Sequence, residues 1–437
     1  MKSYHVWTVG CQMNKADSER LESAMGQLGL SPSPQPDDAD VIVLNSCVVR
    51  QSAEDRVIGN LTRLKPTREG NPDRILALMG CMVGPKTDDL RKRFPYVDVF
   101  MRPQQFDPLI ELLAERLGID PDGCVGPLVA RPAVATYVPI IHGCDKFCTF
   151  CIIPYRRGRE VSRPIDELVR ETEMLVARGV REITLLGQNV DSYGHDLPDG
   201  PDLGDLLAAV NDVDGLQRIR FLTSHPNDMS EHIIDAVANL DKVCEHINLP
   251  VQAGDDEVLE RMRRGYTRDE YLRKVDQIRQ RIPNVTVSTD VIVGFCGETD
   301  AQFRQTYELV EQVGFDKVHA AAYSTREGTL AARKLEDDVP LEEKKERLAQ
   351  LETLQERIAT KLNAAYADRI EQVLVEQVRG GRATGRNRND KLVHFDADPK
   401  AELVGKMVDV RIEDTGPWSL LGTRLVPVEL VAGPAGR

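Results

Sequence analysis

Residues 142–160, HGCDKFCTFCIIPYRRGRE, carry Cys144, Cys148 and Cys151 in a CxxxCxxC spacing, directly after an apolar, β-prone run. Three thiolates so close in sequence can hold three corners of a cubane 4Fe-4S cluster and leave the fourth iron without a protein ligand. A structural zinc site is the alternative, but such sites usually pair two CxxC units or add histidines, and no matched fourth ligand lies nearby. The spacing therefore predicts an iron-sulfur site with one open iron.

The sequence around this motif alternates between β-prone and helical runs. Strands are expected at residues 135–141, 182–188, 218–224, 245–251, 285–293 and 317–324, with helices such as 165–179 and 269–282 between them. Six such βα units predict an open or partial barrel with its active site at the carboxyl ends of the strands. The cysteine motif follows the first of these strands. A further helical run, residues 341–366, has leucine and isoleucine at helical spacing and is expected to pack on the barrel.

A second α/β region precedes the barrel. Strand-like runs at residues 3–9, 39–45 and 74–79 alternate with helical runs at 17–28, 52–64 and 107–117, which predicts a parallel sheet flanked by helices. Cys11, Cys47 and Cys81 each come just after one of these strands. Because parallel strands share one carboxyl edge, we expect the three thiols to converge there. Three buried, inert cysteines are the alternative.

The overall prediction is an α/β protein of three parts. From about residue 367 the pattern turns to short strands with glycine-rich turns, as in a small β-barrel. We expect domains at residues 1–117, 133–366 and 367–432, with a linker rich in glycine and proline at 118–132. The length of 437 residues agrees with three domains of about 150 residues each.

Composition and charge exclude several classes of protein. The residue usage is ordinary for a globular chain, and no apolar run reaches the roughly 18 residues needed to span a bilayer. The start of the chain lacks the features of a signal peptide, so we expect a cytoplasmic protein without a membrane contact. Nine cysteines, an odd number, argue against a disulfide framework. The net charge of −14 repels phosphate backbones, so any contact with a nucleic acid must be local.

Two arginine-rich segments are candidates for such a contact. Residues 379–391, RGGRATGRNRNDK, place Arg382, Arg386 and Arg388 in a turn with glycine and asparagine that is expected to be exposed. Beside the cysteine motif stand Arg156 and Arg157. Such patches can bind phosphates while an unstacked base reaches a buried site. A solvated charged face is the alternative for either patch alone.

The motif CxxxCxΦC, with Phe150 at the aromatic position, resembles the signature of the radical S-adenosylmethionine (SAM) enzymes. The resemblance implies that the open iron binds the amino and carboxylate groups of SAM, and that an electron from the cluster cleaves the sulfonium to give a 5′-deoxyadenosyl radical. It also implies that Phe150 packs near the adenine and that the backbone of Ile152 contacts its edge. Two strand ends that match ligand-cupping segments of the family contribute Gly187, Gln188, Asn189, Gly294, Gly297 and Glu298. Cys296 departs from the pattern, because relatives mostly have proline there, and is expected to be a packed small residue.

Further segments, among them TVGCQMN, ADVIVLNSCVVR, MGCM and LPVQAGDDEVLERMRRGYTR, resemble the methylthiotransferases over nearly the whole chain. The residues after about 367 match the TRAM domain of these enzymes. The resemblance implies that Cys11, Cys47 and Cys81 hold a second 4Fe-4S cluster with an open iron, which carries or supplies the sulfur. One SAM donates the methyl group and another yields the radical.

GCQMN and LLGQNVDSYG favour the subfamily that methylthiolates C2 of N6-isopentenyladenosine next to the anticodon of tRNA. Neighbouring subfamilies modify threonylcarbamoyladenosine in tRNA or an aspartate of a ribosomal protein. The implied partners are a tRNA bearing isopentenyladenosine, an electron donor such as flavodoxin or ferredoxin, and a sulfur source; we expect a monomer.

Two other classes of protein stay open. One is a two-cluster electron carrier or sulfur-delivery scaffold with no reaction of its own, against which the SAM-like strand ends argue. The other is an RNA-binding protein with a structural metal, which the acidic net charge disfavours.

Overall fold

The computed structural model describes residues 1–48, 51–118 and 133–425. Its amino-terminal part is a parallel sheet in the order β2-β1-β3-β4-β5. The strands are β1 (Ser3–Thr8), β2 (Ser31–Pro32), β3 (Val41–Ser46), β4 (Ile75–Gly80) and β5 (Val99–Met101). The helices around it are α1 (Gln12–Gln27), α2 (Gln51–Glu69), α3 (Asp88–Arg93) and α4 (Asp107–Leu117). Strands β3 and β4 are buried along their whole length, because apolar clusters cover both faces of the sheet.

The central part is an open barrel of six strands that follow the chain order. They are β6 (Ala135–Pro139), β9 (Glu182–Leu186), β10 (Arg218–Phe221), β11 (His246–Asn248), β12 (Thr286–Val293) and β13 (Lys317–Ala322). They form two three-stranded parallel sheets that meet at a bridge between Ile219 and Val243. Among the described residues no ladder joins β13 to β6, so the barrel stays open on that side. The partial barrel predicted from the sequence is confirmed.

Helices cover the outside of this barrel. The longer ones are α6 (Ile165–Ala177), α7 (Leu203–Asn211), α8 (Glu231–Asn239), α10 (Arg268–Arg281) and α11 (Asp300–Val313). Shorter elements at the strand ends are α5 (Ile153–Arg157), α9 (Asp256–Met262), α12 (Leu330–Lys334) and the hairpin of β7 (Ile141–His142) with β8 (Val161–Ser162). The helix α13 (Leu341–Ala364) packs on β13 through a stripe that buries Leu351 and Leu354, as its spacing predicts.

The carboxy-terminal part is a closed five-stranded barrel. Its strands are β14 (Ile370–Arg379), β15 (Arg382–Arg386), β16 (Leu392–Asp396), β17 (Met407–Thr415) and β18 (Leu420–Arg424). The prediction that Arg382, Arg386 and Arg388 share one exposed turn is wrong. Residues 382–386 form a strand that pairs with β14 on one side and β16 on the other, and this ladder fixes the backbone despite the glycine at its centre.

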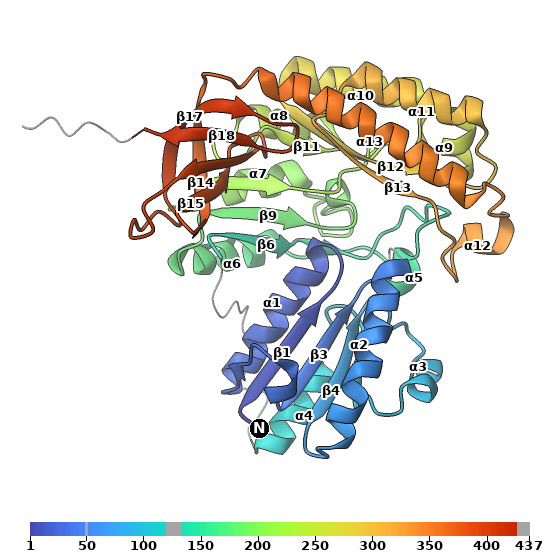
Figure 1. Ribbon diagram of the computed structural model, residues 1–437, viewed down its shortest axis with the longest axis vertical. Coiled ribbons are helices and arrows are strands. Elements are labelled where there is room, and N and C mark those ends of the chain that lie inside the picture. Colours follow the sequence, from blue (N-terminus) through green and yellow to red (C-terminus); the bar gives the residue numbers. More distant parts are fainter. Residues whose placement is uncertain (49–50, 119–132, 426–437) are drawn as a thin grey trace, which may run out of the picture.

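The three parts pack against one another (Figure 1). Helix α1 of the amino-terminal domain lies against β6 at the open side of the central barrel, and the small barrel sits at the amino-terminal ends of the central strands. Apart from Gly118, which ends α4 with φ 67°, the predicted linker lies outside the described residues. Within the described ranges, no helix has the length and hydropathy of a membrane span.

Candidate functional site: two cysteine groups on one cavity

Cys11, Cys47 and Cys81 meet at the carboxyl edge of the amino-terminal sheet. Cys47 and Cys81 directly follow β3 and β4, and Cys11 is the residue before α1. Glycine is required beside them: a Cβ on Gly10, whose φ is 126°, would lie 2.5 Å from the Cβ of Cys47. Likewise, a Cβ on Gly80 would lie 2.4 Å from the carbonyl oxygen of Ser46. The backbone of this edge is therefore built to let the three thiols approach each other.

Buried polar side chains fix these strand ends. Asn14 donates through Nδ2 to the carbonyl oxygens of Val9 and Ser46, both at 2.8 Å. Asn45 donates to the carbonyl oxygen of Asn14 at 2.7 Å, and Ser46 donates to that of Met79 at 2.6 Å. The start of α1 is thereby tied to the ends of β3 and β4, so the three cysteine positions move as one unit.

Cys144, Cys148 and Cys151 lie on a loop at the carboxyl end of the central barrel, closed at its base by the β7–β8 hairpin. The N–H of Cys144 donates to the carbonyl oxygen of Gly158 at 3.1 Å, and that of Cys151 donates to Cys148 at 3.0 Å. Arg264, fully enclosed by the barrel core, donates through Nη1 to the Sγ of Cys148 at 3.3 Å. A positive charge thus lies beside this cysteine group.

Burial disfavours the charged form of the thiols in both groups. Burial raises the pKa of Cys81 and of Cys144 to about 11, and that of Cys151 to about 12. The neighbouring cysteines of each group raise these pKa values further, because like charges repel. No disulfide joins the eight cysteines in the described part of the chain. A bound cation would stabilise the thiolate form that burial disfavours. Three cysteines in one site therefore fit a bound metal, and iron in particular.

The two groups face one cavity of about 750 Å³, which we call the cysteine cavity. Its lining includes Cys11 and Cys81 from one group and Cys151 from the other. Four of the residues expected to contact SAM also line it: Phe150, Ile152, Gly187 and Gln188. The two cysteine groups, which come from different domains, therefore share one reaction space.

The other four residues expected at the SAM site lie outside this lining and have partners of their own. Asn189 donates to Asp228 at 2.6 Å. Glu298 accepts from the N–H of Gly294 at 2.6 Å and pairs with Arg347 at 2.8 Å, while the N–H of Gly297 donates to Asp338. From this end of β12, residues 290–292 line the cavity instead. Cys296 is buried in the barrel core, where a packed small residue is expected.

A second cavity of about 640 Å³ follows the inside of the barrel, and we call it the lumen cavity. It runs from Glu376, Arg386 and Asp390 of the small barrel to Cys11 and Cys47. The two cavities share part of their lining, namely Cys11, Gln12, Leu222, Thr223, Asp290 and His319. Charged and polar side chains project from the central strands into this lumen, in contrast to the packed apolar interior usual for a closed barrel.

The arginines proposed for RNA binding have very different surroundings. Arg157 is buried and pairs with Asp17 at 3.1 Å, whereas Arg382 is exposed on β15. Arg386 is half-buried near Glu376 and Asp390. Arg388 donates to both carboxylate oxygens of Glu245 at 2.8 Å, which docks the small barrel on the central one. The backbone carbonyl of Arg156 accepts from Arg102 at 3.2 Å.

Several residues of the site carry no local signal in the sequence. Arg264 reaches Cys148 across 116 residues, and Asp290 and His319 enter both cavities from β12 and β13. The alternation along these two strands points to residues that face the lumen, but it does not distinguish a polar lumen from solvent. Asn14, within GCQMN, could be found only through its motif.

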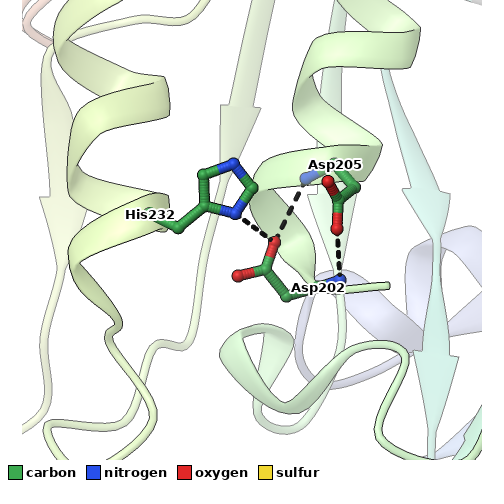
Figure 2. Close-up of side chains that lie close together, drawn as sticks. All are labelled: Asp202, Asp205 and His232. Atoms are coloured by element: carbon green, nitrogen blue, oxygen red, sulfur yellow. Dashed lines mark hydrogen bonds and ion pairs between the residues drawn. The ribbon is translucent and has the colours of Figure 1, made fainter. Parts of the chain in front are cut away.

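A group of metal-ligating residues lies elsewhere, at the start of α7 and on α8 (Figure 2). The carboxylate of Asp202 accepts from the N–H of Asp205 at 3.1 Å, and that of Asp205 accepts from the N–H of Asp202 at 2.9 Å. His232 contacts Asp202 at 2.9 Å. This is a helix capping box with a histidine beside it, and these hydrogen bonds account for the grouping without a metal.

Comparison with known proteins agrees with this arrangement. Residues 138–310 match the radical SAM superfamily, residues 3–102 match the uncharacterized protein family UPF0004, and residues 366–425 match the TRAM domain. The chain is 47% identical over 420 residues to the tRNA-2-methylthio-N(6)-dimethylallyladenosine synthase of Dehalococcoides mccartyi (strain CBDB1), covering 96% of this chain and 98% of the relative. This chain belongs to the family of tRNA-2-methylthio-N(6)-dimethylallyladenosine synthases.

The synthase of Herpetosiphon aurantiacus is 48% identical over 435 residues, covering 98% of this chain and 99% of the relative. A solved structure of the radical S-adenosylmethionine methyltransferase TsrM from Kitasatospora setae superposes with a TM-score of 0.53 at 15% identity, covering 74% of this chain and 72% of that one. That likeness concerns the fold. The predicted membership of the radical SAM methylthiotransferases is confirmed, and with it an enzyme that uses SAM and a 4Fe-4S cluster.

Proposed function

We propose that this enzyme inserts sulfur at C2 of N6-isopentenyladenosine, next to the anticodon of tRNA, and methylates it. The observation that carries the proposal is the cavity shared by two cysteine groups from two domains. Radical formation at one group and sulfur supply at the other require a common space for the adenine. A simple electron carrier has no need for a cavity of about 750 Å³ beside its cysteines.

Two 4Fe-4S clusters fit the donor sets. Cys144, Cys148 and Cys151 would hold the cluster that binds SAM, and the amino-terminal group, Cys11, Cys47 and Cys81, would hold the second. When bound, SAM would supply the methyl group and the radical that abstracts hydrogen, and the second cluster would supply the sulfur. The chain itself encloses the reacting atoms: Phe150 and Ile152 close one side of the cavity. Gly187 lets this strand end pack closely, because a Cβ there would lie 2.5 Å from Cγ2 of Ile141.

Substrate selection would use both cavities. Leu186, Leu222 and Val291 offer the cysteine cavity an apolar wall for the isopentenyl chain. We assign Asn189, Gly294, Gly297 and Glu298 to the support of the SAM-side strand ends, because their hydrogen bonds fix the backbone there. For the tRNA we keep Arg386, which lines the lumen cavity, and the exposed Arg382 as backbone contacts, with Arg156 beside the cysteine loop.

The remaining parts of the proposal concern partners. An electron donor such as flavodoxin or ferredoxin, and a sulfur source, would serve a monomer in the cytoplasm. We keep the division into domains 1–117, 133–366 and 367–432.

Mass spectrometry of tRNA nucleosides from cells that lack this protein tests the proposal. Methylthio-isopentenyladenosine should be absent and isopentenyladenosine should accumulate, and the wild-type chain should restore the product. Complementation with Cys47→Ala should fail. Full product formation by Cys47→Ala would instead make the first group packed core cysteines, and a loss of methylthio-threonylcarbamoyladenosine would assign the enzyme to the neighbouring subfamily.

A further inference from the structure

The side chain of Arg157, at the end of α5, crosses from the central barrel into the amino-terminal domain. Its Nη2 donates to Asp17 at 3.1 Å and to Asn14 at 3.2 Å, both on α1. The side chain is 2% exposed. A full positive charge is therefore held in the interior, beside the residues that position Cys11.

Besides Asp17 and Asn14, the guanidinium has the thiol of Cys81 as a hydrogen-bond partner. Nε and Nη1 are buried and have no nitrogen or oxygen partner in the described part of the chain. Arg157 lines the cysteine cavity together with Cys11, Cys81 and Cys151. Buried donors without an acceptor are costly, so an anionic acceptor within reach of one of these nitrogens is favourable.

The charge of Arg157 acts on the amino-terminal cysteine group. The guanidinium lies beside Cys81 and Cys11, two of the three cysteines of that group, and lines the same cavity as they do. Asp17 pairs with Arg157 through Oδ2 and Nη2 at 3.1 Å, so this carboxylate does not occupy Nε or Nη1. The pocket formed by Arg157, Cys11 and Cys81 is therefore favourable for a small anion that also binds a metal.

We propose that Arg157 is a positioning residue that binds the anionic sulfur held at the amino-terminal cysteine group before its transfer. This inference rests on the proposed function, since it takes Cys11, Cys47 and Cys81 to hold a cluster with an open iron. Hydrosulfide is a monovalent anion that suits both the iron and unpaired N–H donors. Because the same side chain also ties α1 to α5, it fixes the sulfur relative to Cys151 on the opposite wall.

Binding of hydrosulfide to the full-length protein, reconstituted anaerobically with iron and studied without SAM or tRNA, tests this assignment. The dissociation constant is read from the change in the electron paramagnetic resonance spectrum of the reduced clusters. Arg157→Gln should weaken binding by about tenfold or more, and Arg157→Lys should weaken it less because the charge is kept. The matched control is Arg159→Gln, whose side chain is 72% exposed and pairs with Asp145; it should bind as the wild type does.

A second variant separates an anion site from a tie between domains. Asp17→Asn keeps the guanidinium but removes its carboxylate partner, so hydrosulfide should bind as tightly as in the wild type or more tightly. If Asp17→Asn weakens binding as much as Arg157→Gln does, or if Arg157→Gln binds normally with its full iron content, the assignment is overturned. A wild-type protein that binds hydrosulfide through Arg157 but makes no methylthiolated tRNA would support the anion site and contradict the proposed function.

Discussion

Two buried arginines from the central barrel each lie beside a cysteine of a different group. Arg264 donates to Cys148, and Arg157 lies beside Cys81. A low-dielectric site strengthens such contacts, because water does not screen them.

The positions of the cysteines could be predicted from their local spacing and from the strand ends that they follow. The arginines could not, since each meets its cysteine only through tertiary packing between segments far apart in sequence.

His225, near Arg264, gives the stability of the protein a pH dependence that can be measured. Burial, with the charges of Arg264 and Lys146, lowers the pKa of His225 to about 2. Below about pH 6.5 the unfolded chain takes up a proton on this histidine that the folded chain does not, so the free energy of unfolding falls as the pH falls. The contribution is up to about 1.4 kcal/mol per pH unit between pH 6.5 and the folded pKa.

His225→Asn should remove that part of the slope, because asparagine does not titrate. Anaerobic urea unfolding of both proteins between pH 5 and 7.5 measures it, with His232→Asn, an exposed histidine, as the control. A variant His225→Asn with the same slope as the wild type would show that another group, such as the buried His246, is responsible.

At the scale of elements, the small barrel docks through the turn between β15 and β16. Arg218 and Arg220 of β10 donate to carbonyl oxygens of Arg386 and Asn387, both at 2.6 Å. The strands of the central barrel could be predicted from their apolar runs. The local sequence does not predict strands β15 (RATGR) and β18 (LLGTR), because glycine and arginine have weak β propensity and only the closed ladder stabilises these strands.

Arg388→Ala should loosen this docking. The variant loses the bidentate contact with Glu245 and leaves that carboxylate without its partner, so amide hydrogen exchange in residues 382–396 should become faster by about tenfold. Hydrogen exchange with mass spectrometry measures the effect.

Arg382→Ala is the matched control, since Arg382 is exposed on the same barrel. Its exchange should stay unchanged, whereas the salt dependence of its tRNA binding should fall by a slope of about 0.7 if the side chain neutralises one phosphate of a single strand. If the two variants exchange alike, Glu245 does not hold the small barrel in place. An unchanged salt slope would make Arg382 part of a solvated face.

At the scale of the whole molecule, the reaction space exists only when the domains are assembled. Neither cysteine group closes the cysteine cavity alone, because its walls come from α1, the loop after β7 and strands β12 and β13. The sequence supports two separate three-cysteine sites. The two sites face one another because α1 docks on β6. This docking depends on the fit of two surfaces, and no local sequence pattern predicts it.

The assembled arrangement predicts how iron and activity divide between the domains. Anaerobic reconstitution should load about eight irons per chain, as two 4Fe-4S clusters require. Alanine at Cys144, Cys148 and Cys151 should remove about half of the iron and all cleavage of SAM.

Alanine at Cys11, Cys47 and Cys81 should also remove half of the iron. SAM cleavage should persist in this variant while sulfur insertion stops, because the radical site is built by the other domain. Iron analysis and the yield of 5′-deoxyadenosine measure both effects, with Cys244→Ala, a buried cysteine that lines neither cavity, as the control. Formation of 5′-deoxyadenosine by the first triple variant would contradict the radical assignment, and an unchanged iron content in the second would leave its three thiols as packing residues.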